Sequence, residues 1–159
     1  LLKLTDSWCD KKITLLTVSG TVGIGKTHLA IAAVNRVINE HFDDVLYAPA
    51  SEVAVNSRDF DNGMSERYRK RLQKVEWLVL DDVGVEWDPR GYMQSFYHSI
   101  IDHRYSKGMQ TLITTNLSLD GKKKDSLLKR LGERIVSRLN HKGISLCYEA
   151  TGQDIRRSK

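Results

Sequence analysis

Residues 20–27 have the composition of a loop that holds phosphate. They read Gly-Thr-Val-Gly-Ile-Gly-Lys-Thr and match the pattern G-x-x-x-x-G-K-[S/T] at every fixed position. Glycines let backbone N–H groups turn inward around phosphate oxygens, which Lys26 is expected to reach, while the Thr27 hydroxyl is expected to bind Mg²⁺. The predicted nucleotide-binding residues are Gly20, Thr21, Val22, Gly23, Ile24, Gly25, Lys26, Thr27 and His28.

Two carboxylates follow an apolar run farther along the chain. Trp-Leu-Val-Leu at 77–80 leads directly into Asp81 and Asp82, which is the Walker B pattern. A buried parallel strand delivers its last residues to the ligand edge of a sheet, so we expect Asp81 to hold Mg²⁺ and Asp82 to orient the attacking water. Glu86 is a weaker candidate and is more simply interpreted as a solvated loop charge.

A neutral amide ends a third apolar run. Asn116 follows the strand expected at 111–115, and its side chain can donate to a γ-phosphate and accept from a water. The alternative is that Asn116 only caps a turn. Farther on, Arg134 and Arg138 lie four residues apart on one face of an expected helix. They are either arginines that complete a neighbouring subunit's site or ordinary solvated residues.

The elements that position these residues alternate between two patterns. Short apolar, β-branched runs predict strands at 13–18, 45–48, 77–80, 111–115 and 144–148. Helical spacing predicts helices at 27–39, 93–105 and 130–139, and the polar, basic stretch 51–74 is loosely helical. This alternation predicts an α/β fold in which helices cover both faces of a mostly parallel, doubly wound sheet.

Composition favours one soluble domain with an anionic partner. The chain has 159 residues and a formal net charge of +5, without an apolar run long enough for a membrane span or an evident secretory signal, so a cytoplasmic address is expected. Cys9 and Cys147 are interpreted as free thiols, and no zinc site is expected. Two basic clusters predict salt-sensitive binding of single-stranded DNA, unless they are simply solvated faces: Arg67, Arg69, Lys70 and Arg71, and Lys122, Lys123, Lys124, Lys129 and Arg130.

With these motifs placed, the chain resembles the DnaC, DnaI and IstB group of AAA+ ATPases over nearly its whole length. The resemblance lies in the stretches 25–30, 80–84, 104–105, 114–118, 132–134 and 137–139. It implies a single AAA+ domain over residues 1–159, a P-loop NTPase three-layer sandwich with a mostly parallel five-stranded sheet and no separate helical lid. Because loaders of this group carry a helicase-gripping segment before this core, the chain looks like an excised core or a reduced protein.

The resemblance also implies roles for single residues. Arg138, in Ser-Arg-Leu, looks like the arginine finger of a head-to-tail ring or filament, and Arg156 is a candidate second sensor. Asp82 stands where AAA+ proteins usually have Glu, which implies slow hydrolysis. The implied ligands and partners are ATP/ADP, Mg²⁺, single-stranded DNA, and a replicative DNA helicase or a transposase.

Four functions remain open on the sequence. The leading one is an ATP-hydrolysing helicase loader, and the nearest alternative is an IstB-like transposition helper with the same core. A P-loop small-molecule kinase would also use residues 20–27, but it would have no need of Asn116 or a trans-acting arginine. A scaffold that binds ATP without hydrolysing it is compatible with the short side chain of Asp82.

Overall fold

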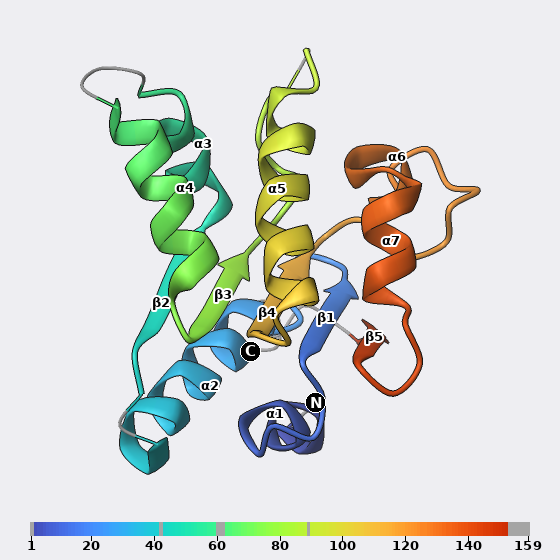
Figure 1. Cartoon of the computed structure of the whole chain (residues 1–159). Helices are drawn as coiled ribbons and strands as arrows, with labels where there is room; N and C mark the ends of the chain where they lie inside the picture. The colour runs from blue at the N-terminus through green and yellow to red at the C-terminus, as the bar shows by residue number, and fades with distance from the viewer. Residues whose placement is uncertain (1, 42, 60–62, 89, 153–159) are drawn as a thin grey trace.

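The architecture is one five-stranded parallel sheet between two helical layers. A computed structural model describes residues 2–41, 43–59, 63–88 and 90–152. The strands lie in the order β2-β3-β4-β1-β5 (Figure 1). Their bounds are β1 Leu15–Gly20, β2 Val45–Pro49, β3 Trp77–Asp81, β4 Gln110–Thr115 and β5 Ser145–Ala150. The predicted α/β fold is confirmed, and every strand pairing in the described part is parallel.

Two hydrophobic cores form because both faces of the sheet are covered. The central strands β1, β3 and β4 are buried along their whole length, whereas the edge strands β2 and β5 are partly exposed. Side chains alternate between the faces, so Leu16 and Val18 of β1 enter one core and Leu15 enters the other.

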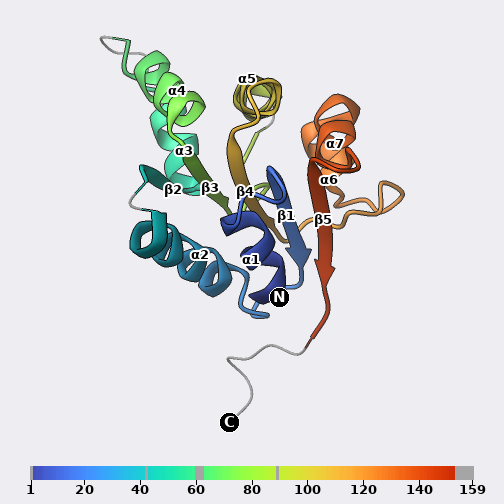
Figure 2. The ribbon, with the colours of Figure 1, turned by 60° about the horizontal axis from the view of Figure 1, so that its bottom comes forward.

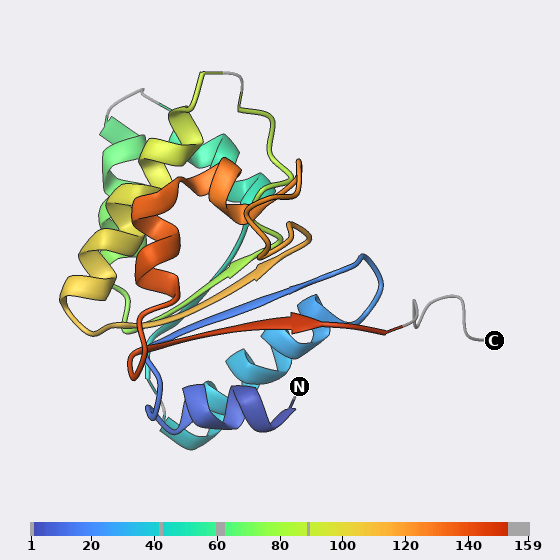
Figure 3. The ribbon, with the colours of Figure 1, turned by 90° about the vertical axis from the view of Figure 1, so that its right-hand side faces the viewer.

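Helices are distributed unequally over these faces, as Figures 2 and 3 show. One face carries α1 (Leu2–Cys9) and α2 (Lys26–His41). The other carries α3 (Ala50–Ser57), α4 (Met64–Lys74), α5 (Tyr92–Ser106), α6 (Leu127–Leu131) and α7 (Glu133–Leu139). None of the described helices is long and apolar enough to cross a membrane.

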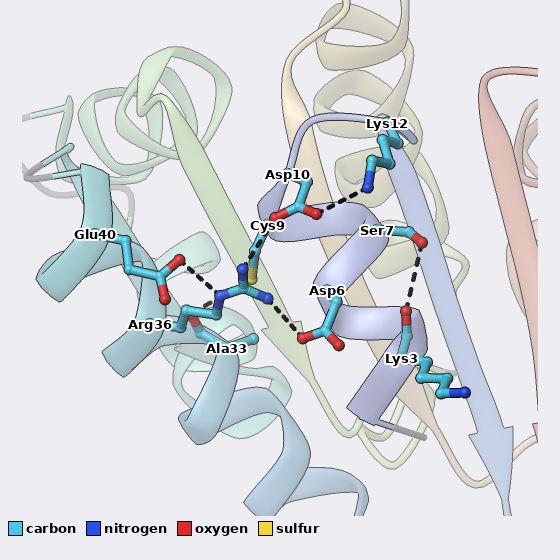
Figure 4. Close-up of polar contacts among 9 residues, drawn as sticks. All are labelled: Lys3, Asp6, Ser7, Cys9, Asp10, Lys12, Ala33, Arg36 and Glu40. Carbon is cyan, nitrogen blue, oxygen red and sulfur yellow. Dashed lines mark hydrogen bonds and ion pairs between the residues drawn. The ribbon is translucent and has the colours of Figure 1, made fainter.

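Helix α1 was not expected from the sequence. Trp8 is fully buried and meets Trp77 of β3 edge-on, with ring centroids 4.9 Å apart. Arg36 of α2 holds the helix from outside by donating to Asp6 and Asp10, at 2.6 and 2.9 Å (Figure 4). Burial raises the pKa of the Cys9 thiol to about 11. A short helix with few apolar residues gives little periodic signal, and its stability comes from this packing.

The helix predicted at 130–139 is two helices. Gly132 adopts a φ of 85° and separates α6 from α7. A β-carbon at this position would lie 2.8 Å from Nε2 of Gln94. The expectation of one helix was wrong because Gly132 allows both a left-handed φ and this close approach.

Arg104 joins α5 to the starts of two strands. Its side chain is fully buried, and burial lowers its pKa to about 9. Nε donates to Oγ1 of Thr111 at 2.8 Å. The guanidinium nitrogens also donate to the backbone carbonyls of Leu72, Gln73, Val75, Glu76 and Gln110. The charge is therefore satisfied by peptide dipoles at the end of α4 and the starts of β3 and β4.

Candidate nucleotide-binding site

Three strands deliver the predicted motifs to one edge of the sheet. β1 ends at Gly20, β3 ends at Asp81, and β4 ends directly before Asn116. β4 lies between the other two, with Ser19 opposite Thr115. Parallel strands share their carboxyl edge, so residues far apart in sequence meet here.

The phosphate loop needs its glycines for physical reasons. A β-carbon on Gly20 would lie 2.3 Å from Cδ1 of Ile24 and 2.5 Å from the carbonyl oxygen of Ala150. Gly23 and Gly25 have φ values of 87° and 90°, in the region that favours glycine. Helix α2 begins at Lys26, so the N–H groups of its first turn lie beside the loop, as anion binding requires.

Lys26 folds back across this loop. Its Nζ donates to the carbonyl oxygens of Gly20 and Thr21, both at 2.8 Å, and to Oδ1 of Asn116 at 2.7 Å. The side chain is buried within the helix start. The ammonium group is therefore fixed between the loop and the end of β4, in position to meet an anion.

Asn116 connects Lys26 to the acidic strand end. Its Oδ1 accepts from Lys26, and its Nδ2 donates to Oδ1 of Asp82 at 2.5 Å. One side chain thus contacts two of the three charged groups predicted for this site, Lys26 and Asp82. A turn cap alone would not make these two contacts.

Asp81 is buried and oriented by two hydroxyl groups. Thr114 Oγ1 donates to one carboxylate oxygen at 2.5 Å, and the Tyr47 hydroxyl donates to the other at 2.7 Å. Burial, followed by this hydrogen bond, raises the pKa of Tyr47 above its usual range. Tyr47 and Thr114 belong to the site but were missed, because a tyrosine in an edge strand and a threonine inside a strand carry no motif.

Asp82 has a different environment. Its φ is 60°, its backbone N–H donates to Thr114 Oγ1 at 2.8 Å, and its side chain is half-buried. Burial and then the negative charge of Asp81 raise its pKa, while the Lys26 ammonium opposes that shift. A carboxylate with a raised proton affinity at the edge of the site is suited to accept a proton from water.

The donor set fits Mg²⁺ bound together with a nucleotide. Within the described residues, no group of three or more His, Cys, Asp or Glu side chains could hold a metal by itself. Mg²⁺ usually takes one or two carboxylates, and the remaining ligands are phosphates and waters. Asp81 would supply the carboxylate and the exposed Thr27 would supply a hydroxyl.

Glu86 is not the solvated loop charge that we expected. It is only 6% exposed, and its Oε2 accepts from the backbone N–H of Gly84 at 2.9 Å. Gly84 has a φ of 102°, and a β-carbon there would lie 2.4 Å from Cδ1 of Leu117. Glu86 therefore braces the loop after β3, which packs tightly against the loop after β4.

Arg138 lies far from the phosphate loop of its own chain. Ser145 donates to its carbonyl oxygen at 2.6 Å. Ser145 pairs with Leu15 at the amino edge of the sheet, whereas Gly20 lies at the other end of β1, at the carboxyl edge. The side chain is 17% exposed rather than fully on the surface: it forms an ion pair with Asp102, and its guanidinium lies 5.5 Å from the Tyr105 ring centroid. Arg134 is exposed, and Arg156 lies outside the described residues.

The two basic clusters lie at opposite ends of the sheet. Arg67, Lys70, Arg71 and Lys74 of α4 line a cleft of about 350 Å³ together with Asp44, near β2. Arg69 points elsewhere and pairs with Glu66 at 2.6 Å. The lysines at 122–124 belong to the loop between β4 and α6, on the β5 side of the molecule (Figure 1). The clusters therefore do not form one continuous surface.

Comparison with known families identifies the family of this chain. Residues 3–158 match the family described as IstB-like ATP binding protein. The chain belongs to this family. The IstB-like assignment agrees with the phosphate-loop sequence and with the contacts of Lys26, and it establishes ATP binding as a property of the family.

Curated relatives of this IstB-like chain include two from Escherichia coli strain K12. The uncharacterized protein YdaV is 30% identical over 131 residues, covering 82% of this chain and 50% of YdaV. The replicative helicase loader DnaC is 28% identical over 132 residues, covering 82% of this chain and 51% of DnaC. The chain thus spans about half the length of these relatives.

Solved structures support the same fold. The crystal structure of the DnaC helicase loader superposes with a TM-score of 0.77 at 25% identity, covering 94% of this chain and 87% of that chain. The predicted AAA+ P-loop fold is confirmed for this IstB-like chain.

Proposed function

We propose that the chain is the ATP-hydrolysing core of a helicase-loader-type AAA+ protein that acts in DNA replication. The observation that carries the proposal is the bridge made by Asn116, which contacts Lys26 on one side and Asp82 on the other. A single amide between the phosphate-binding cation and the second carboxylate is suited to detect whether a terminal phosphate is present. The family and the DnaC relative supply the biological setting.

Each residue has a role in this reaction. Lys26 neutralises phosphate charge together with the N–H groups of the loop, and Asn116 orients the terminal phosphate and the attacking water. Asp82 accepts the proton of that water, for which its raised pKa is favourable. Asp81 and Thr27 would hold Mg²⁺, which would neutralise phosphate charge.

The geometry favours an ATPase over a small-molecule kinase or a non-hydrolysing scaffold. A kinase positions an acceptor molecule at the terminal phosphate, whereas here the neighbouring groups are an amide and a carboxylate, which suit a water nucleophile. The left-handed backbone conformation of Asp82 directs its carboxylate toward Asn116. A scaffold that binds ATP without hydrolysing it would not need this strained conformation.

The decisive experiment combines binding with turnover. Calorimetry with ATP and Mg²⁺ is expected to show binding by the wild type and none by Lys26→Ala, because backbone amides alone do not offset the phosphate charge. Phosphate release is then measured with and without single-stranded DNA. Undiminished affinity of Lys26→Ala would contradict the site, and binding without release under either condition would leave the scaffold as the function.

The partner proposal rests on the relatives. DnaC is named a replicative helicase loader. We propose that this chain acts in the cytoplasm, engages a replicative helicase and assembles head to tail on single-stranded DNA. The second candidate, an IstB-like transposition helper, is favoured by the family description. Pull-down with a purified replicative helicase and with a purified transposase, each with ATP, separates the two.

A further inference from the structure

A cleft lies beside the phosphate loop on the side of β5. It has a volume of about 330 Å³, and its walls come from the loop, the end of β4, the β4–α6 connection and the end of β5. The residues that matter here are Gly20, Thr21, Asn116, Ser118, Lys123 and Glu149. The cleft therefore shares three residues with the Lys26 network and adds one cation, Lys123, which that network does not use.

The connection that carries Lys123 is held at its base. Ser118 donates its N–H to the Asp125 carbonyl at 3.0 Å and accepts from the Leu127 N–H at 2.9 Å. Ser19 of β1 donates to the Leu117 carbonyl at 2.6 Å, which fixes the start of the connection to the strand that leads into the phosphate loop. The connection is thus positioned relative to the site.

Its tip is ordered as well. Asp120 accepts from the N–H of Lys122 through its side chain, at 3.0 Å, and from the N–H of Lys123 through its carbonyl, at 3.1 Å. A β-carbon on Gly121 would lie 2.6 Å from Cδ2 of Leu128, so the tip packs closely on α6. The backbone of Lys123 is consequently fixed, and only its flexible side chain is free to adjust.

The charges around the cleft favour a phosphate group. Lys122, Lys123 and Lys124 are exposed, and within the described part of the chain none of them forms an ion pair. Of the three, Lys123 lines the cleft. Glu149 places a negative charge on the β5 wall, so an anion in the cleft is expected nearer to Asn116 and Lys123 than to β5.

We propose that Lys123 is a second phosphate-binding cation of the nucleotide site and contacts the terminal phosphate of ATP bound to its own chain. The inference rests on the proposed function, because it needs ATP in the loop. Asp81 and Asp82 lie at the end of β3, on one side of β4. The cleft that Lys123 lines is on the other side of β4, toward β1 and β5, so Lys123 approaches the site from the side opposite to the two carboxylates. Arg138 cannot supply this charge in cis, because it lies at the other edge of the sheet.

The test measures ATP and ADP affinity of Lys123→Ala by calorimetry. A charge-assisted contact is worth about a tenfold change in affinity, so ATP should bind roughly tenfold more weakly while ADP changes less than about twofold. Lys122→Ala and Lys124→Ala are matched controls, because each removes the same charge from the same connection. Both should stay within about twofold of the wild type for ATP, and Lys123→Arg should restore most of the affinity.

Each result is decisive. Equal losses in all three alanine variants would mean a general charge effect and would overturn the proposal, as would equal losses for ATP and ADP. A variant that binds ATP normally but loses affinity for a single-stranded oligonucleotide would assign Lys123 to nucleic-acid phosphate instead. If wild type and Lys26→Ala both fail to bind ATP, the proposed function itself is wrong; if only Lys26→Ala fails and Lys123→Ala is normal, this inference alone is overturned.

Discussion

Asp81 and Asp82 are adjacent carboxylates with opposite surroundings. Asp81 is buried and accepts two hydroxyl hydrogen bonds, which suits a fixed metal ligand. Asp82 has a left-handed backbone, is half-buried, and takes a raised pKa from burial and from Asp81. The two neighbouring aspartates therefore have different surroundings because β3 ends at Asp81.

The clearest residue-scale prediction concerns Asp82→Asn. The variant keeps an oxygen that can accept from Asn116, so ATP affinity should stay within about twofold of the wild type. Without a proton acceptor, phosphate release should fall by about 10² or more. Calorimetry and a phosphate-release assay measure the two quantities. Unchanged turnover would show that another group activates the water.

Asp82 also links function to stability. Because its pKa is raised in the folded protein above the ordinary value of 3.8, the folded state binds this proton more tightly than the unfolded state. The unfavourable contribution of Asp82 is therefore absent below the ordinary pKa and grows as pH rises through the folded pKa.

A pH-resolved unfolding experiment tests this linkage. Without nucleotide, Asp82→Asn should have a thermal midpoint about 1–4 °C above the wild type at neutral pH, because the substitution removes the unfavourable charge. Asn tolerates the left-handed conformation as Asp does. The difference should shrink as the pH falls through the raised folded pKa of Asp82 toward its ordinary value of 3.8. A midpoint below that of the wild type at neutral pH would contradict the assigned pKa direction.

At the scale of elements, Arg104 is the main connection on the α5 side. Its guanidinium reaches five backbone carbonyls and one hydroxyl, which belong to α4, to the connection between α4 and β3, and to β4. Most buried arginines pair with a carboxylate, whereas this one is satisfied by peptide dipoles. The arrangement holds the amino ends of β3 and β4 and thereby sets where their carboxyl ends, with Asp81 and Asn116, lie.

We expect Arg104→Met to destabilise the fold by about 3–5 kcal/mol, because several buried carbonyls lose their donors. Arg104→Lys should recover little, since an ammonium group does not reproduce the planar fork. Urea unfolding measures both. Arg36→Met is the control, because Arg36 is partly exposed and its ion pairs lie at the surface. An equal effect of the two Met variants would contradict a special role for Arg104.

The sequence predicted the central elements well and their connections poorly. Strands β1, β3 and β4 are short runs rich in apolar and β-branched residues because both of their faces are buried, and the motifs at their ends could be placed without a structure. By contrast, α1 depends on Trp8 meeting Trp77, and the break at Gly132 depends on Gln94. Tyr47 joined the site only through the pairing of β2 with β3. Contacts of this kind leave no periodic signal.

At the scale of the whole molecule, Arg138 can meet an ATP only across an interface. It lies at the amino edge of the sheet, whereas the loop lies at the carboxyl edge. In a head-to-tail assembly, one subunit's amino edge or flank faces its neighbour's site, and Arg138 would exchange Asp102 for a phosphate. We propose that the ion pair with Asp102 holds the arginine in the isolated subunit.

The corresponding prediction is that Arg138→Ala keeps its ATP affinity while turnover falls by about 10³ or more. Mixing it with Lys26→Ala, which retains its own Arg138, should restore part of the activity. Asp102→Asn is the matched control: it removes the ion-pair partner and should leave turnover at least as high as in the wild type. Mixing that never restores turnover, at concentrations where subunits associate, would mean that Arg138 only packs α7 on α5.

DNA binding is predicted for the basic cleft of α4. Combined Arg67→Gln, Lys70→Gln and Arg71→Gln should weaken binding of a single-stranded oligonucleotide and lower its log–log salt slope by about 2, because three phosphate contacts are removed. Fluorescence anisotropy over a salt series measures the slope. Arg69→Gln is the control, since Arg69 does not line the cleft. An unchanged slope in the triple variant would assign the cleft to a solvated surface.

The strand order has a consequence for synthesis of the protein. The first strand to be synthesised is β1, which leads into the phosphate loop, yet its two neighbours in the sheet are β4 and β5. Leu15 therefore cannot form its pairings until Thr111 and Ser145 have been synthesised. A ribosome releases these partners long after it releases Leu15, and such long-range parallel pairing is slow to form. Until β4 and β5 have been synthesised, the nascent chain therefore carries the loop sequence without the neighbouring strands of β1. Nucleotide cannot assist folding in that period, and a chain truncated before β4 would retain residues 20–27 but would have no ATP site.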